Sequence, residues 1–207
     1  MDENMSFVRE KRLARTIEAL ENNNYTVCRA KNTEEARALA QGFVSSGMTV
    51  GFGGSMTLAE TGVLADLRAR GDIELFDRAK DPNAMRKALT ADVFFASTNA
   101  VTETGVLYNV DGNGNRVAAM LFGPQSVVLL VGENKIVPDE AAAVSRVERV
   151  ASPANTERLH CDTPCRKTGF CVHCRSEQRI CRDFVWMRQQ RVKGRIKIIL
   201  IDGEWGY

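Results

Sequence analysis

The sequence predicts an α/β fold in which an open parallel or mixed sheet is covered by helices on both faces. Segments with strand and helix character alternate along most of the 207 residues, the order typical of such sheets. Residues 93–96 and 127–131 are uninterrupted apolar runs, which indicates strands buried on both faces. Hydrophobic residues make up 44% and charged residues 26% of the chain, so it can bury an ordinary globular core.

Capping patterns and apolar spacing predict the helices. Leu13, Ile17 and Leu20 lie on one helical face among charged residues. Asn32 and Thr57 each precede an acidic residue by three positions, as at a helix start. The predicted helices are 5–20, a segment from 32 to the stop at Gly47, 57–69, 82–89 and 138–150, the last with Pro138 in its first turn, while 116–121 is ambiguous.

Short apolar and β-branched runs between turn residues predict the strands. Residues 99–110 predict a hairpin or an irregular loop around Gly105, and residues 111–115 form a strong turn. The predicted strands are 25–28, 48–52, 73–76, 93–96, 127–131 and 196–201. We expect an α/β domain over residues 1–152, a cysteine-rich metal-binding segment over 153–192, and a C-terminal strand within 193–207 that returns to the sheet.

The charge distribution and the terminus limit the classes of function. The longest apolar runs are far shorter than the ~18 residues of a membrane span. The N-terminus is charged and lacks the apolar core of a signal peptide, so a cytoplasmic location is expected. Residues 153–207 carry eleven Lys and Arg against six Asp and Glu, although the whole chain is only +2. Neither an aromatic RNA-binding motif nor a basic zipper helix accompanies this basic tail, so nucleic acid is an unlikely partner.

A glycine-rich turn separates the strand at 48–52 from the helix at 57–69. Gly53 and Gly54 let the backbone approach a ligand closely, and Ser55 and Thr57 add hydroxyl donors at the helix start. The third glycine of a dinucleotide fingerprint and the Gly-Lys-Ser/Thr of a P-loop are both missing. The turn is therefore either an anion-binding loop or only a tight connection.

Residues 97–116 are unusually polar for segments that flank buried strands. Glu103 is a candidate general acid or base, and Arg116 a candidate clamp for a carboxylate or phosphate. The alternative is that Asn and Gly only make turns here and that both charges are surface groups.

Five of the six cysteines lie within 21 residues, with the spacing C-x3-C-x5-C-x2-C-x6-C from Cys161 to Cys181. In a cytosolic protein such clustering indicates metal or redox chemistry rather than disulfides. The crowded thiols favour an iron–sulfur cluster, whose negative charge the interleaved arginines would offset. Zinc remains the alternative, with His160 and His173 as further donors, as does a segment without metal.

Several motifs together resemble the LUD-domain (lactate-utilization) family, in a short form with a C-terminal cysteine motif. The resemblance begins at about Gly47 and is carried by residues 51–60 (GFGGSMTLAE), 99–105 (NAVTETG), 109–120 (NVDGNGNRVAAM), 132–137 (GENKIV), 163–165 (TPC), 168–174 (TGFCVHC) and 179–181 (RIC).

The resemblance implies a fold related to ribose-5-phosphate isomerase, glucosamine-6-phosphate deaminase and CoA transferases. It strengthens Glu103 and Arg116 as catalytic candidates. It also implies that Cys165, Cys171, Cys174 and Cys181 hold the metal, which we expect to be a [4Fe–4S] cluster, with Cys161 as the spare. The ligand-binding candidates are Gly53, Gly54, Ser55, Thr57, Glu60, Asn99 and Asn115.

These observations predict an iron–sulfur electron-transfer component that acts on or near a small carboxylate such as lactate. Partners would be that anionic ligand and other redox subunits, and a homo-oligomer is compatible with the sequence. One alternative is an isomerase- or transferase-like enzyme that binds phosphate and carries a structural metal, with Glu103 as its base. Another is a module that senses redox state without catalysis.

Overall fold

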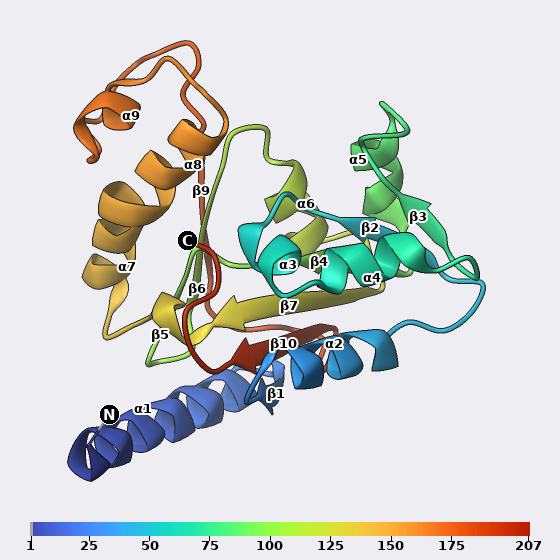
Figure 1. The fold of residues 1–207 in the computed structure, drawn as a ribbon, viewed down its shortest axis with the longest axis horizontal. Helices are drawn as coiled ribbons and strands as arrows, with labels where there is room; N and C mark the ends of the chain where they lie inside the picture. The colour runs from blue at the N-terminus through green and yellow to red at the C-terminus, as the bar shows by residue number, and fades with distance from the viewer. Residues whose placement is uncertain (1) are drawn as a thin grey trace.

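The computed structural model describes residues 2–207 and contains two sheets with helices packed around them (Figure 1). The strands of the larger sheet are β1 (Thr26–Ala30), β2 (Thr49–Phe52), β3 (Glu74–Phe76), β4 (Val93–Ala96), β7 (Ser126–Gly132) and β10 (Ile196–Ile201). They run parallel in the order β1-β10-β7-β4-β2-β3, so the C-terminal strand β10 lies inside the sheet.

Helices cover both faces of this sheet, as predicted. The first face carries α1 (Glu3–Asn22), α5 (Ala84–Lys87) with η1 (Ala88–Thr90), and α6 (Asn115–Leu121). The second carries α2 (Thr33–Gly42), α3 (Met56–Glu60) and α4 (Val63–Ala69). Because side chains alternate along a strand, Phe94 of β4 enters the first core and Phe95 the second.

A smaller sheet lies beside the carboxyl ends of the parallel strands. It comprises β5 (Ala100–Thr102), β6 (Leu107–Asp111), β8 (Ile136–Val137) and β9 (Asp183–Met187), in the order β8-β5-β6-β9. Residues 99–110 thus form the hairpin that was one of the two predictions. Sequence reasoning missed β9, whose Trp186 stacks on Tyr108 with ring centroids 4.0 Å apart.

One long helical stretch links the smaller sheet to the cysteines. It consists of α7 (Glu140–Arg146), the π-helical turn η3 (Val147–Ala151) and α8 (Ser152–Arg158). It passes through residue 152 without interruption, so the helix predicted for 138–150 is longer than expected. The short helix α9 (Pro164–Thr168) follows and opens the cysteine segment, beyond the end of α8 in Figure 1.

Local chemistry explains where the other helices begin and end. Asn32 and Ser55 cap α2 and α3 by accepting the backbone N–H groups of Glu35 and Leu58. The single helix predicted over 57–69 is wrong, because Gly62 adopts a left-handed conformation (φ 81°) that separates α3 from α4. The ambiguous segment 116–121 belongs to α6. Within residues 2–207, no helix has both the length and the apolar character needed to cross a membrane.

Candidate functional site

A polar cavity of about 210 Å³ opens at the carboxyl end of the large sheet. Loops that follow β2, β3, β4 and β7 contribute to its wall, together with α8 and the cysteine segment. After β2 the chain continues to β3, at the edge of the sheet. After β4 it continues in the opposite direction, toward β7 in the centre of the sheet. The loops after β2 and β4 therefore diverge, and such a switch point is where open α/β sheets usually bind ligands.

Arg116 lines this cavity but is fully engaged by the protein. Its guanidinium binds both Asp111 (2.9 and 2.7 Å) and Asn99 Oδ1 (2.9 Å). It also donates to Asn109 Oδ1 and to the carbonyl oxygens of Ser97 and Val110. These acceptors account for all five of its N–H groups. Arg116 therefore shapes the cavity wall, and its charge is offset by Asp111.

Lys135, in η2 (Glu133–Lys135), is buried to 2% exposure and lines the same cavity. Its Nζ donates to Thr57 Oγ1 (2.8 Å) and Ser97 Oγ (3.0 Å). Burial, reinforced by the positive charges of Arg146 and Arg116, lowers the pKa of Lys135 to about 7. Near neutral pH this amine is therefore poised between its charged and neutral forms.

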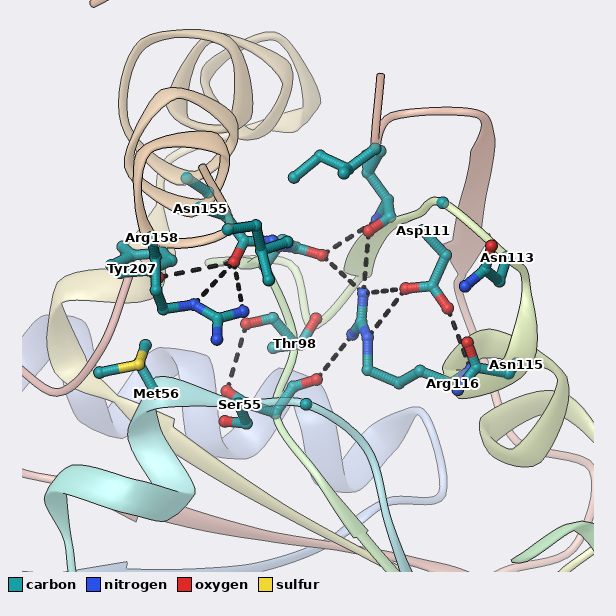
Figure 2. A pocket seen from close by; sticks show the side chains of 18 of the residues that line it. Ser55, Met56, Thr98, Asp111, Asn113, Asn115, Arg116, Asn155, Arg158 and Tyr207 are labelled. Atoms are coloured by element: carbon teal, nitrogen blue, oxygen red, sulfur yellow. Dashed lines mark hydrogen bonds and ion pairs between the residues drawn. The ribbon is translucent and has the colours of Figure 1, made fainter. Parts of the chain in front are cut away.

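Two further cations, Arg158 and Arg78, lie at the rim of the cavity. Arg158 and Tyr207 lie on the side of the cavity opposite Arg116 and Asp111, with Ser55 and Thr98 between them (Figure 2). Arg158 is held by Asn155 Oδ1 at 2.7 Å and, unlike Arg116, forms no ion pair within residues 2–207.

Arg78, which follows β3, would lie 3.4 Å from a Cβ atom at Gly54, so its guanidinium covers the glycine turn. It too forms no ion pair among the described residues. Among residues 2–207, Asp111 has the only side-chain carboxylate that lines the cavity, and it is already paired. The cavity therefore has a positive potential suited to an anion.

The structure divides the residues predicted to bind a ligand. Gly54, Ser55, Asn99, Asn115 and Arg116 all line the cavity.

Other predicted residues lie outside it. Gly53 packs against Arg116, where a Cβ atom would come within 3.0 Å of that side chain, and Thr57 lies behind Lys135. Glu60 accepts the Gly206 N–H instead. Glu103 pairs with Arg12 (2.8 Å) and Arg15 (3.1 Å) of α1, so the structure does not bring it to Arg116.

Sequence reasoning missed Lys135, Ser97, Arg158 and Tyr207. Lys135 and Ser97 could have been predicted from the sequence. Each is a polar residue shortly after an apolar strand, at the end of the sheet where ligands bind. The sequence pattern that indicates Arg158 is weaker. The cavity is lined by one face of the helix, with residues at helical spacing: Ala151, Asn155, Arg158 and Leu159.

The family model of the LUD domain matches residues 13–201. The chain belongs to the LUD domain family. A solved structure of a DUF162 family protein from Deinococcus radiodurans is similar, with a TM-score of 0.55 and 13% identity over 94% of this chain and 98% of that one. A ribose 5-phosphate isomerase from Plasmodium falciparum gives a TM-score of 0.34 at 18% identity, over 51% of this chain and 52% of that one. No curated protein matches. The first structure supports the fold of this LUD domain.

The cysteines of this LUD domain's cysteine segment are less exposed than most of the residues between them. Cys165 is buried, and Cys161, Cys171, Cys174 and Cys181 are partly buried and free of disulfides. Most residues between them, including Phe170, Val172 and His173, are exposed. An irregular surface loop in which cysteines are more shielded than apolar residues such as Phe170 and Val172 has the donor set expected of a metal centre.

Contacts around the thiols bring parts of this segment together. Thr156 and Thr163 each place a hydroxyl 3.4 Å from Cys165 Sγ. Arg179 ties the Cys174 and Cys181 carbonyl oxygens together at 2.7 and 2.6 Å. Burial raises the pKa of the Cys171 thiol, and the charges of Cys181, Glu148 and Cys165 add to this effect.

Among residues 2–207, only Glu148, Cys171 and His173 form a group of three metal-type ligand atoms within 4.8 Å of one another. The four cysteines that the resemblance singles out do not form such a compact group. Their segment nevertheless adjoins the cavity. Ile180 lines it directly, and the Arg182 N–H donates to the Asp111 carbonyl oxygen at 2.8 Å.

Proposed function

We propose that this LUD protein is a redox component that carries a [4Fe–4S] cluster on Cys165, Cys171, Cys174 and Cys181 beside a site for a small carboxylate such as lactate. The observation that carries the proposal is the contact between the two sites. Ile180, next to Cys181, forms part of the wall of the cationic cavity. A centre on the thiols would therefore lie next to the bound anion.

The spacing of the thiols supports a cluster over a single zinc ion. Four thiolates at ~2.3 Å from one zinc would lie about 3.8 Å apart in a tetrahedron. No three cysteine sulfur atoms of residues 2–207 fall within 4.8 Å of one another. A cluster places iron and sulfide between its ligands and so accommodates a wider spacing.

The cavity supports a carboxylate ligand by its charge and its donors. Arg158, Arg78 and Lys135 line the ligand space and have no paired carboxylate in the described part of the chain, residues 2–207. Ser55 and Thr98 add hydroxyl groups. A guanidinium binds a carboxylate through two parallel hydrogen bonds. Oxidation of a 2-hydroxy acid removes two electrons, whereas the cluster would carry them one at a time, so another redox subunit would complete the reaction.

The isomerase- or transferase-like alternative has less support. It requires Glu103 as the base at the ligand. The structure instead places Glu103 in ion pairs with Arg12 and Arg15, on the turn that contacts α1.

The test is the iron and sulfide content of protein purified without oxygen, with single Cys→Ser variants of the four ligands. We expect a brown protein whose iron is lost in C165S, C171S, C174S and C181S. The matched controls are C28S, a free cysteine in strand β1, and C161S, the spare cysteine, and both should retain iron. Stoichiometric zinc in a colourless protein would overturn the cluster assignment.

The carboxylate site is tested separately on the same preparation. Lactate and pyruvate should raise the melting temperature of the wild type through preferential binding to the folded state. This shift should be lost in R158Q and kept in R191Q, which changes an exposed arginine outside the cavity. An equal shift in both variants would exclude the cavity as the binding site.

A further inference from the structure

Lys135 is a buried amine whose only hydrogen-bond partners among residues 2–207 are two hydroxyl groups. Its Nζ donates to Thr57 Oγ1 and Ser97 Oγ, and no carboxylate of residues 2–207 forms an ion pair with it. An ammonium group can form three such bonds, which leaves one position of Nζ free of protein partners. Because Lys135 lines the cavity, we take that position to face the ligand space.

This arrangement is costly if its purpose is structural. Burying an ammonium group without a counter-charge destabilises a fold. The positive charges of Arg116 and Arg146 increase that cost, and they lower the pKa of Lys135 further after burial itself. A neutral amide could connect two hydroxyl groups without this penalty. The lysine is therefore better explained by the chemistry of its nitrogen than by its role in packing.

The surroundings favour the neutral amine, which has a nucleophilic lone pair. Lysines that react with carbonyl groups are activated in this way, by desolvation or by neighbouring cations. Both conditions are met at Lys135. The hydroxyl groups of Thr57 and Ser97, in contact with Nζ, can accept and return protons during such a reaction.

We propose that Lys135 captures the carbonyl group of a 2-keto acid as an imine, with the carboxylate of that ligand held by the cationic rim. Nζ forms a bond to the C2 carbon, and the C2 oxygen leaves as water with the two protons that Nζ gives up. The step is reversible and needs no oxidant or reductant. It rests on the proposed function only in that the cavity holds a carboxylate.

The experiment treats the full-length protein with pyruvate and sodium borohydride, which reduces an imine to a stable amine. Intact-mass and peptide mass spectrometry should find one reduced pyruvate per chain, on Lys135. K135M should lose this label. K197M should keep it, because Lys197 is also a partly buried lysine bound to a hydroxyl group, Ser126 Oγ at 2.7 Å, but lies outside the cavity.

Further measurements control for the ligand, for the cationic rim and for the folding of the variant. Lactate, which has no carbonyl group, should give no label, and R158Q should be labelled less than the wild type by pyruvate. Thermal unfolding of K135M shows whether that variant is folded, and K135Q provides a second test of the same position. Labelling spread over many lysines, or persisting in folded K135M, would overturn the proposal.

Measuring both iron content and labelling on one wild-type preparation separates this inference from the proposed function. If Lys135 is labelled while iron is absent from the wild type, the imine chemistry stands and the cluster assignment fails. If iron is present but Lys135 is not labelled, the redox assignment stands and the role of Lys135 fails.

Discussion

Two buried cations at the cavity differ in what surrounds them. Arg116 pairs with Asp111 and donates all of its N–H groups to protein acceptors, so it acts as a fixed part of the cavity wall. Lys135 has hydroxyl partners and, within residues 2–207, no paired carboxylate, so little in the protein stabilises its charge. The first residue stabilises the fold, whereas the second lowers its stability near neutral pH.

Lys135→Met should change how stability depends on pH. The pKa of Lys135 falls from an ordinary 10.5 to about 7 in the folded protein, so the unfolded chain binds more protons between these values. The folded wild type is therefore penalised most below about pH 7, and the penalty fades as the pH rises toward 10.5. Urea unfolding should show K135M more stable than the wild type near pH 6, by an amount that shrinks by pH 9. A difference that does not vary with pH would contradict this.

Arg116→Ala should be strongly destabilising. It leaves the Asp111 carboxylate buried without its cation, and breaking a buried ion pair in this way costs about 3–5 kcal/mol. Arg37→Ala is the matched control, because solvent screens its ion pair with Asp66 and the loss should be much smaller. Chemical denaturation of both variants measures the contrast, and equal losses would argue against a structural role for Arg116.

At the scale of elements, the hairpin β5–β6 anchors the long helix α1. Glu103, in the turn, pairs with Arg12 and Arg15, and Asn23 Nδ2 donates to the Gly105 carbonyl oxygen at 3.0 Å. The Glu-Thr-Gly motif thus has a structural explanation here. It joins two segments more than 80 residues apart in the sequence.

Gly105→Ala should loosen this contact. Gly105 has φ 78°, and a Cβ atom there would lie 2.7 Å from the backbone of Ala19 in α1, so the helix must shift. Gly47→Ala is the control, with φ 83° but no atom within 4 Å of the added Cβ. Both variants bear the left-handed strain of about 1–3 kcal/mol, and only G105A adds the clash. Melting temperatures should therefore fall further for G105A, and equal falls would show that α1 adapts freely.

At the scale of the whole molecule, the parallel sheet and the cysteine segment differ in how they are held. Strands β7 and β10 pair in the centre of the sheet and are almost entirely buried. Residues 170–182 have little regular structure and few backbone hydrogen bonds. The proposed cluster would therefore supply much of the order of this segment.

Removal of iron by an anaerobic chelator should raise amide hydrogen exchange in residues 161–182 and leave the central strands protected. Local opening is easiest where backbone hydrogen bonds and apolar contacts are few, which is the situation of this segment. Mass spectrometry of peptides from β10 provides the internal control. Unchanged exchange in the cysteine segment would mean that it is ordered without the metal.

The sequence by itself determined the scaffold, and it predicted a metal centre in the cysteine segment, which stays a prediction. Apolar runs, capping residues and glycines act locally, so they predicted the parallel strands, most helices and the turn at Gly53–Ser55. The crowded thiols were equally local. The single helix over 57–69 failed because Gly62 lies where helical spacing appears to continue, and β9 was missed because its pairing with β6 is remote in sequence.

Only the tertiary structure decided which polar residues share the cavity. Glu103 and Lys135 both follow strands, yet one faces α1 and the other the ligand space. The direction of a side chain at the end of a strand depends on partners from distant segments, such as Arg12 for Glu103 and Thr57 for Lys135. Sequence spacing does not encode these pairings, because they arise only when the sheet and its covering helices have packed together.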